Sequence, residues 1–112
     1  MNRPDELLDS DGYPTDEYLE FIRGYTDETM DIMDFIDILS DGWWMPSWGF
    51  RLHRKYEGKI KLELHTGGWS GNEEIIREIL SNISLTHFKM RYVKWTAGGH
   101  YYFEIPTNQE EK

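Results

Sequence analysis

Apolar residues recur along this chain with two different periods, and the change of period divides it in two. In residues 18–25 the apolar positions are three or four residues apart, which is typical of a helix with one buried face. Thr15 can cap this helix, and Asp16 and Glu17 fall in its first turn, where the helix dipole favours carboxylates. Gly24 is expected to weaken the end of the helix.

A second helical pattern begins at a cap formed by Thr26 or Asp27 and continues to about Ser40, before Asp41-Gly42. Its apolar residues share one face, which consists of Ile32, Phe35, Ile36 and Leu39. Its acidic residues share the opposite face, which consists of Asp27, Asp31, Asp34 and Asp41, with Asp37 at the edge. This acidic face either keeps the protein soluble or forms a binding surface.

The segment after this helix is rich in tryptophan, with Trp43, Trp44 and Trp48 around Pro46. Indole rings this close in sequence are more typical of a corner of the core, or of a cover over a hinge, than of a cofactor site. Beyond this segment the apolar residues alternate with polar ones, which indicates β-strands.

Two hairpins are expected from this alternation, with a helix between them. In the first, Phe50 and Leu52 precede a turn at residues 56–58, and Ile60, Leu62 and Leu64 follow it. In the second, Phe88, Met90 and Tyr92 alternate with His87, Lys89, Arg91, Val93 and Trp95, and after a turn at residues 97–99 Tyr101, Phe103 and Ile105 alternate with His100, Tyr102 and Glu104. The intervening helix presents Ile75, Ile76, Ile79 and Leu80 on one face and ends near Asn82.

This order of elements predicts an α+β fold, with two N-terminal helices followed by β-β-α-β-β. The four strands are expected to form a mainly antiparallel sheet with the helices on one face. We expect a loosely held acidic arm in residues 1–12, a single domain in residues 13–106 and a polar tail in residues 107–112.

The glycine-rich turn at residues 66–72 precedes the helix that lies between the hairpins. Exposed backbone N–H groups before a helix can bind an anion, but the glycine spacing fits neither a P-loop nor a dinucleotide fingerprint. Ser70 and Glu73 have the spacing of a capping box, which would use these N–H groups, and Glu74 adds a second carboxylate that would repel a phosphate. A structural role for the turn is therefore favoured over anion binding.

Charge is distributed unevenly along the 112 residues, whose net charge is −9. Residues 1–42 contain 13 acids and two bases, whereas residues 43–112 contain 8 acids and ten bases. The chain has no cysteine, no apolar run of membrane-spanning length and no apolar signal-peptide core at its start, so we expect a cytoplasmic protein that does not bind membranes.

Three runs of residues carry a family resemblance: Trp48-Gly49-Phe50, Gly67-Gly68-Trp69-Ser70-Gly71-Asn72-Glu73 and Gly98-Gly99-His100-Tyr101-Tyr102-Phe103-Glu104-Ile105. They resemble a group of small uncharacterised proteins that are encoded by bacteriophages and prophages. The resemblance extends from about Tyr13 to Ile105. It implies expression inside a bacterial host, where many small acidic phage proteins bind host machinery, but it assigns no functional residue.

The polar face of the expected sheet is basic and bears aromatic rings. Small domains use such faces to bind single-stranded nucleic acid, with cations on phosphates and rings on bases. The candidate residues are Lys59, Lys61, Lys89, Arg91, Trp95 and Tyr102. Two alternatives are that this face meets only water, and that the acidic arm covers it.

All four histidines are expected on the same face, and His53 and His65 can meet across the first hairpin. Their spacing matches no metal motif, so no metal or other cofactor is expected. A catalytic nucleophile is not expected either, because Gly71 directly follows Ser70 where a nucleophile elbow needs another residue.

The leading hypothesis is a non-enzymatic protein that binds a host protein of unknown identity, as an anti-defence inhibitor or a nucleic-acid mimic. The acidic face would carry the interaction through Asp27, Asp31, Asp34, Asp37 and Asp41. Binding of single-stranded nucleic acid by the sheet is the alternative. A structural phage component or a homodimer is a third hypothesis.

Overall fold

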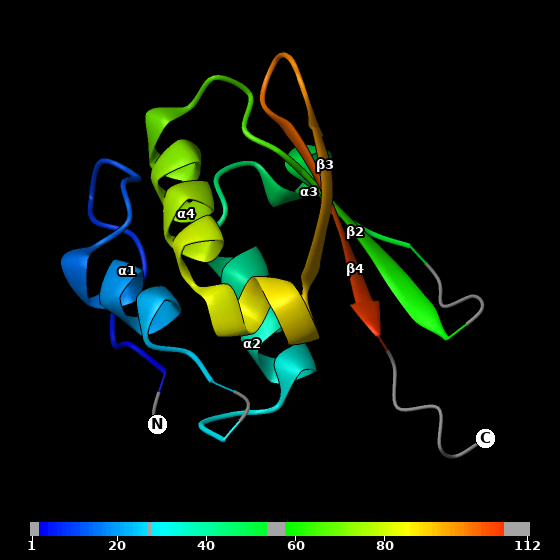
Figure 1. Cartoon of the computed structure of the whole chain (residues 1–112). Coiled ribbons are helices and arrows are strands. Elements are labelled where there is room, and N and C mark those ends of the chain that lie inside the picture. Colours follow the sequence, from blue (N-terminus) through cyan, green and yellow to red (C-terminus); the bar gives the residue numbers. More distant parts are fainter. Residues whose placement is uncertain (1–2, 27, 54–57, 107–112) are drawn as a thin grey trace.

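The computed structural model describes residues 3–26, 28–53 and 58–106. It has the predicted α+β fold, in which α1, α2 and α4 lie on one side of a four-stranded sheet (Figure 1). The predicted polar tail at residues 107–112 lies outside the described residues. No helix in the described ranges is both long enough and apolar enough to cross a membrane.

Helix α1 (Asp16–Arg23) forms where the apolar pattern predicts it. The hydroxyl of Thr15 accepts a hydrogen bond from the backbone N–H of Tyr18, and Asp16 and Glu17 occupy the first turn. Tyr18, Phe21 and Ile22 are buried. The predicted cap, dipole placement and apolar face of this helix are all confirmed.

Helix α2 (Ile32–Asp41) begins later than predicted, with Asp31 as its cap. No helix begins at the expected cap Thr26, whose hydroxyl accepts from the N–H of Glu28 and whose carbonyl accepts from the backbone N–H and the hydroxyl of Thr29 at 3.0 and 2.6 Å. These local bonds close a turn in place of a first helical turn. The other expected cap, Asp27, lies outside the described residues.

The sheet consists of β1 (Phe50–Leu52), β2 (Lys59–His65), β3 (Arg91–Thr96) and β4 (His100–Pro106), in the order β1-β2-β4-β3. All three neighbouring pairs are antiparallel, so the two predicted hairpins are joined through β2 and β4. Most of the turn predicted at residues 56–58 lies outside the described residues.

The predicted strand at residues 87–92 is partly wrong. Residues Leu85–Lys89 form a single π-helical turn, η1, and β3 begins only at Arg91. The backbone N–H of Met90 donates to the carbonyl of Leu85, and both side chains are buried. The turn leaves Phe88 69% exposed although its place in the alternation predicted a buried ring.

Helix α4 (Ser70–Ser81) confirms the helix predicted between the hairpins, and Ile75, Ile76 and Ile79 are buried on it. The predicted capping box is wrong, because Ser70 is the first helical residue and makes no capping bond. The carboxylate of Glu73 instead accepts a hydrogen bond from the hydroxyl of Thr66 at 3.2 Å. A short helix that the sequence did not predict, α3 (Pro46–Gly49), precedes β1.

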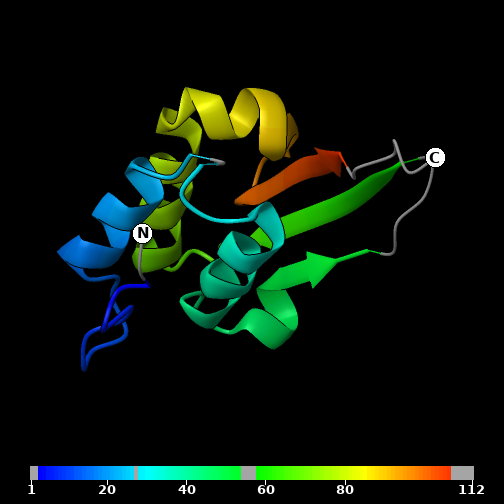
Figure 2. The ribbon, with the colours of Figure 1, turned by 90° about the horizontal axis from the view of Figure 1, so that it is seen from below.

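One core joins the helices to the inner face of the sheet. It is lined by Leu62 and Leu64 of β2 and by Phe103 and Ile105 of β4, and α2 contributes the fully buried Phe35 and Leu39. Figure 2 shows that the helices cover this face while the strands extend beyond them. Trp43 is buried in the same core, which confirms the structural interpretation for one of the clustered tryptophans.

The described part of the acidic arm packs against the domain, although a loosely held segment was expected. Leu7 reaches the core, and its carbonyl accepts a hydrogen bond from the backbone N–H of Thr15 at 2.9 Å. The hydroxyl of Thr15 also donates to the carbonyl of Glu6. In Figure 2 the arm lies beside α1, away from the sheet, so its described residues do not cover the polar face.

Asn82 connects the end of α4 to the end of α1. Its side-chain amide donates to the carbonyls of Ile22 and Tyr25 at 3.0 and 2.9 Å, and its side-chain oxygen accepts from the N–H of Leu85. The residue is 7% exposed, so water cannot replace these partners.

We therefore expect Asn82→Ala to lower the free energy of unfolding by about 2–4 kcal/mol, because buried backbone groups lose their hydrogen bonds. Urea unfolding measures this change. The matched control is Ser84→Ala, an exposed neighbour, which should change stability by less than about 0.5 kcal/mol. An equally small effect of Asn82→Ala would contradict the role assigned to this amide.

Candidate functional site

The acidic face of α2 is exposed, and its described carboxylates differ in what they contact. Asp34 and Asp37 are exposed and form no ion pair with any described residue. Asp31 accepts the capping bond from the N–H of Met33, and Asp41 lies 2.9 Å from the guanidinium of Arg3. Of the five predicted residues, the structure thus places four along α2, while Asp27 lies outside the described residues.

The outer face of the sheet, defined as the face that points away from the helices, is mainly basic. Its side chains follow from the strand register, in which opposite residues share a face. The outer face contains Arg51, His53, Lys59, Lys61, Glu63, His65, Arg91, Lys94, Thr96, His100, Tyr102 and Glu104. Four of the six residues predicted to bind nucleic acid, Lys59, Lys61, Arg91 and Tyr102, are therefore brought together.

The other two predicted residues, Lys89 and Trp95, do not lie on this face. The register of β3 shifts between Tyr92 and Lys94, so Trp95 is opposite Tyr101 on the helix side of the sheet. Lys89 belongs to η1 rather than to a strand. A β-bulge adds one residue and reverses the alternation beyond it, which a strictly regular alternation cannot predict.

The same bulge places Lys94 on the outer face. Lys94 is opposite Tyr102, and its Nζ lies 5.0 Å from the centre of the tyrosine ring. A groove of about 400 Å³ passes over this pair, and Lys61, Glu63, Val93 and Glu104 contribute to its walls. The arrangement presents two amines and one aromatic ring to a common space.

Three histidines and one carboxylate form a hydrogen-bonded chain on the outer face. Glu63 is 2.8 Å from His53 Nε2 through one oxygen and 3.3 Å from His65 Nε2 through the other. The Nδ1 atoms of His65 and His100 are 2.7 Å apart, so one ring donates and the other accepts. His53 and His65, which were expected to contact each other across the first hairpin, are therefore connected through the carboxylate of Glu63.

The pKa of Glu63 is lowered from the ordinary value of a glutamate carboxyl. Partial burial by itself would raise this pKa, but the hydrogen bonds and charges of His53 and His65 lower it further than burial raises it. Within the described ranges no group of three or more carboxylate and imidazole side chains is arranged to hold a metal ion.

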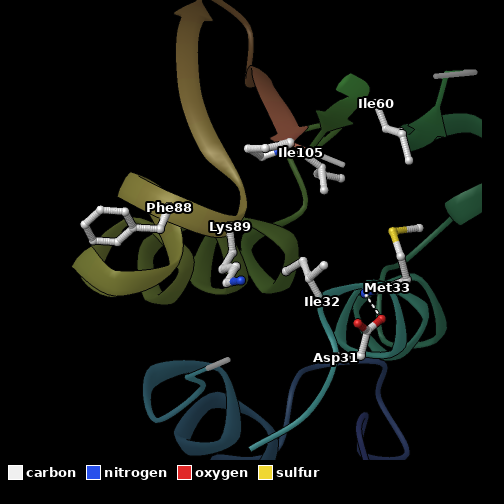
Figure 3. A pocket seen from close by; sticks show the side chains of 8 residues that line it. Asp31, Ile32, Met33, Ile60, Phe88, Lys89 and Ile105 are labelled. Atoms are coloured by element: carbon white, nitrogen blue, oxygen red, sulfur yellow. Dashed lines mark hydrogen bonds between the residues drawn. The ribbon is translucent and has the colours of Figure 1, made fainter. Parts of the chain in front are cut away.

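A separate cavity of about 540 Å³ lies between the start of α2, η1, the start of β2 and the end of β4. Figure 3 shows Ile32, Met33, Ile60 and Ile105 around this space, with Phe88 turned away from it. Asp31 and Lys89 contribute its charged groups. The lining is mainly apolar and contains no nucleophile paired with a base.

The glycine-rich turn is occupied by internal contacts. Thr66 accepts a hydrogen bond from the N–H of Gly68 through its hydroxyl and from the N–H of Trp69 through its carbonyl. Gly67 and Gly68 have φ values of +64° and +75°, which favour glycine. The backbone N–H groups of Gly68 and Trp69 are therefore already hydrogen-bonded within the protein, whereas an anion would need such groups as donors. This supports a structural role for the turn over anion binding.

Comparisons of the chain with protein-family models, with curated proteins and with solved structures gave no match.

The lowered pKa of Glu63 predicts how pH affects its contribution to stability. A carboxylate with a depressed folded-state pKa stabilises the fold above its unfolded pKa, near 4.5, and loses this effect as pH falls through the folded pKa. Glu63→Gln should therefore destabilise the protein at neutral pH, with a difference from wild type that narrows in acid. Urea unfolding at several pH values measures this difference.

A matched control is Glu74→Gln, which lies on α4 and forms no ion pair with any described residue. A difference between wild type and Glu63→Gln that stays constant with pH would contradict the role assigned to the histidine contacts.

Proposed function

We propose that this chain is a non-enzymatic, phage-type protein that binds a host protein in the bacterial cytoplasm through the acidic face of α2. The observation that carries the proposal is the exposure of Asp34 and Asp37 without ion-pair partners among the described residues. The buried Phe35, Ile36 and Leu39 fix the opposite side of the helix. The carboxylates are thus held on a rigid element at fixed spacing.

Rigid carboxylates suit a partner with a basic groove. A groove that normally binds phosphates presents cations at regular spacing, and a helix with acids on successive turns can occupy it. Such pairing increases the association rate and weakens as salt screens the charges. An inhibitor of a host defence or nucleic-acid-handling protein has these properties, and the resemblance to phage proteins supports this context.

The charge pattern of the whole molecule supports the same proposal. The acids of α1, α2 and the arm lie on the helical side, whereas the basic side chains of the sheet lie on the outer face. A basic partner would therefore be drawn to the helical side and repelled from the outer face. This separation of charge would orient the basic partner toward the helical side before the two proteins touch.

The test reverses the charge of Asp34 and Asp37 together, as Asp34→Lys with Asp37→Lys. Affinity capture from the host cell with the wild-type chain identifies the partner, and its dissociation constant is then measured against salt concentration. We expect the double variant to bind the partner at least tenfold more weakly, because two attractions become repulsions. The salt dependence should be reduced in parallel.

The matched control is Glu17→Lys with Glu20→Lys, which makes the same charge change on exposed positions of α1. This control should retain most of the affinity. Unchanged binding by the α2 variant, or an equal loss in the control, would refute a specific role for the acidic face.

A second candidate function is binding of single-stranded nucleic acid by the outer face of the sheet. The observation that favours it is the groove lined by Lys61, Lys94 and Tyr102, in which Lys94 lies over the tyrosine ring. A base can stack on an aromatic ring while the amines contact the phosphates. Lys59 and Arg91 extend the basic surface along the neighbouring strands.

This candidate predicts that a labelled oligonucleotide binds at low salt and dissociates as salt rises. Tyr102→Leu should weaken binding by about 1–3 kcal/mol if a base stacks there, as fluorescence anisotropy can measure. Tyr92→Leu, which changes an exposed tyrosine on the other face, is the control. Absence of binding at low salt would exclude this function.

A further inference from the structure

Three aromatic side chains from distant parts of the chain stack at the surface. We refer to Tyr13, Trp69 and Trp44 as the aromatic stack. The ring of Trp69 lies between the other two, with centroid distances of 4.8 Å to each. The planes are inclined by 21° to Tyr13 and by 25° to Trp44, so the rings are nearly parallel.

The outer rings of the stack remain open to solvent, since Tyr13 is 38% exposed and Trp44 is 40% exposed. Contact with Trp69 removes water from one face of each outer ring. The exposed area therefore belongs to the parts of each outer ring that Trp69 does not cover. An aromatic face in this position is available to a flat ligand group.

The backbone on both sides of the stack is fixed. The side chain of Asn72 accepts from the N–H of Trp44 at 3.0 Å and donates to its carbonyl at 3.1 Å. On the other side, the carboxylate of Asp9 accepts from the N–H of Tyr13 at 3.0 Å. The rings are therefore ordered before any ligand arrives, which lowers the entropy cost of binding.

Gly71 allows the central ring to sit close to the chain. A Cβ atom at this position would lie 2.7 Å from the indole nitrogen of Trp69 and 3.0 Å from the ring of Pro14. The glycine in the turn thus permits the close packing that holds Trp69 between its two neighbours. The same turn carries part of the resemblance to phage proteins.

The segments that carry the stack are acidic. In the sequence, Asp9 and Asp11 precede Tyr13, Asp41 ends α2 shortly before Trp44, and Glu73 lies in the first turn of α4 after Trp69. Asp9, Asp41 and Glu73 already contact the Tyr13 N–H, Arg3 and Thr66, so they supply negative charge around the stack rather than unpaired carboxylates. Aromatic faces are themselves electron-rich and attract cations. Rings and carboxylates together favour a positively charged group with a flat face.

We propose that the outer face of Trp44 binds an arginine side chain of the partner, so that the aromatic stack anchors an arginine-bearing segment of a basic protein. The guanidinium group is planar and weakly hydrated, and it stacks on indole while it donates hydrogen bonds to carboxylates. A lysine ammonium can meet the same charges but cannot stack in this way. The inference rests on the proposed function, to which it adds the chemistry of the partner.

The test compares fluorescein-labelled octa-arginine and octa-lysine as probes, with binding measured by fluorescence anisotropy at low and moderate salt. Both peptides have the same charge, so the acidic surfaces attract them similarly. We expect octa-arginine to bind about two- to fivefold more tightly, because only its side chains stack on the ring. The preference should persist as salt weakens both affinities.

Trp44→Leu should reduce the affinity for octa-arginine to that for octa-lysine, while Trp44→Phe should keep part of the preference. The matched control is Trp48→Leu, an exposed tryptophan outside the stack, which should leave the preference intact. Circular dichroism melting establishes that the variants are folded.

A measurement on the wild-type chain avoids any dependence on folding of the variants. Octa-arginine should shift the indole N–H resonances of Trp44 and Trp69 more than that of Trp48 in ¹⁵N spectra. Equal affinity of wild type for the two peptides, or a preference that survives Trp44→Leu, would overturn the proposal. Larger shifts at Trp48 than at the stack would also overturn it.

The acidic face of α2 is tested separately with Asp34→Asn and Asp37→Asn, which should weaken both peptides equally. If these variants change neither affinity while the arginine preference persists, the proposed use of α2 fails and the arginine anchor stands. If they weaken both peptides but no preference exists, the anchor fails and the acidic face stands.

Discussion

Two buried asparagine side chains hold α4 in place, and the positions of the other elements depend on them. A buried amide must satisfy both its donors and its acceptor within the protein. Asn72, near the start of α4, does so with the backbone of Trp44 and the carbonyl of Thr66. Asn82, just beyond the end of α4, does so with the end of α1 and the start of η1. Apolar packing alone would let α4 shift along its neighbours, whereas these directional hydrogen bonds fix its position relative to Trp44 and to the end of α1.

The two charged surfaces follow from the layers of the fold. Helices present their polar side opposite the core, and the sheet presents its polar side opposite the helices. The acidic side chains of α1 and α2 and the basic side chains of the strands therefore face different directions. A charge asymmetry in the sequence thus becomes a charge asymmetry in space. The ion pairs Arg3–Asp41 and Arg23–Glu78 lie within the helical side, and Lys59–Glu104 lies within the sheet, so these pairs do not neutralise one surface with the other.

The fold was largely predictable because the periods of α1, α4 and the hairpins are regular and their apolar faces are continuous. Three features could not be predicted from periodicity: the start of α2, the turn η1 and the bulge in β3. The first two depend on local hydrogen bonds, and the bulge depends on one extra residue in the strand. The four described acids of the predicted face are exposed on α2 and its cap, with Asp27 outside the described residues, whereas the bulge placed Lys94 rather than Trp95 on the outer face. The aromatic stack could not be inferred, because its three rings meet only after folding and no pattern along the chain relates them.

The contact between His65 and His100 has a consequence for the direction of the N–H bonds across the outer face. Ionised Glu63 can only accept, so a neutral His65 must turn its single proton to Glu63 and leave Nδ1 bare. His100 must then supply the proton between the two Nδ1 atoms, which leaves its own Nε2 as an acceptor. When both rings are neutral, one carboxylate therefore determines the tautomers of two rings on different strands. If both Nδ1 atoms carried protons, neither could accept, and the 2.7 Å contact would have to open.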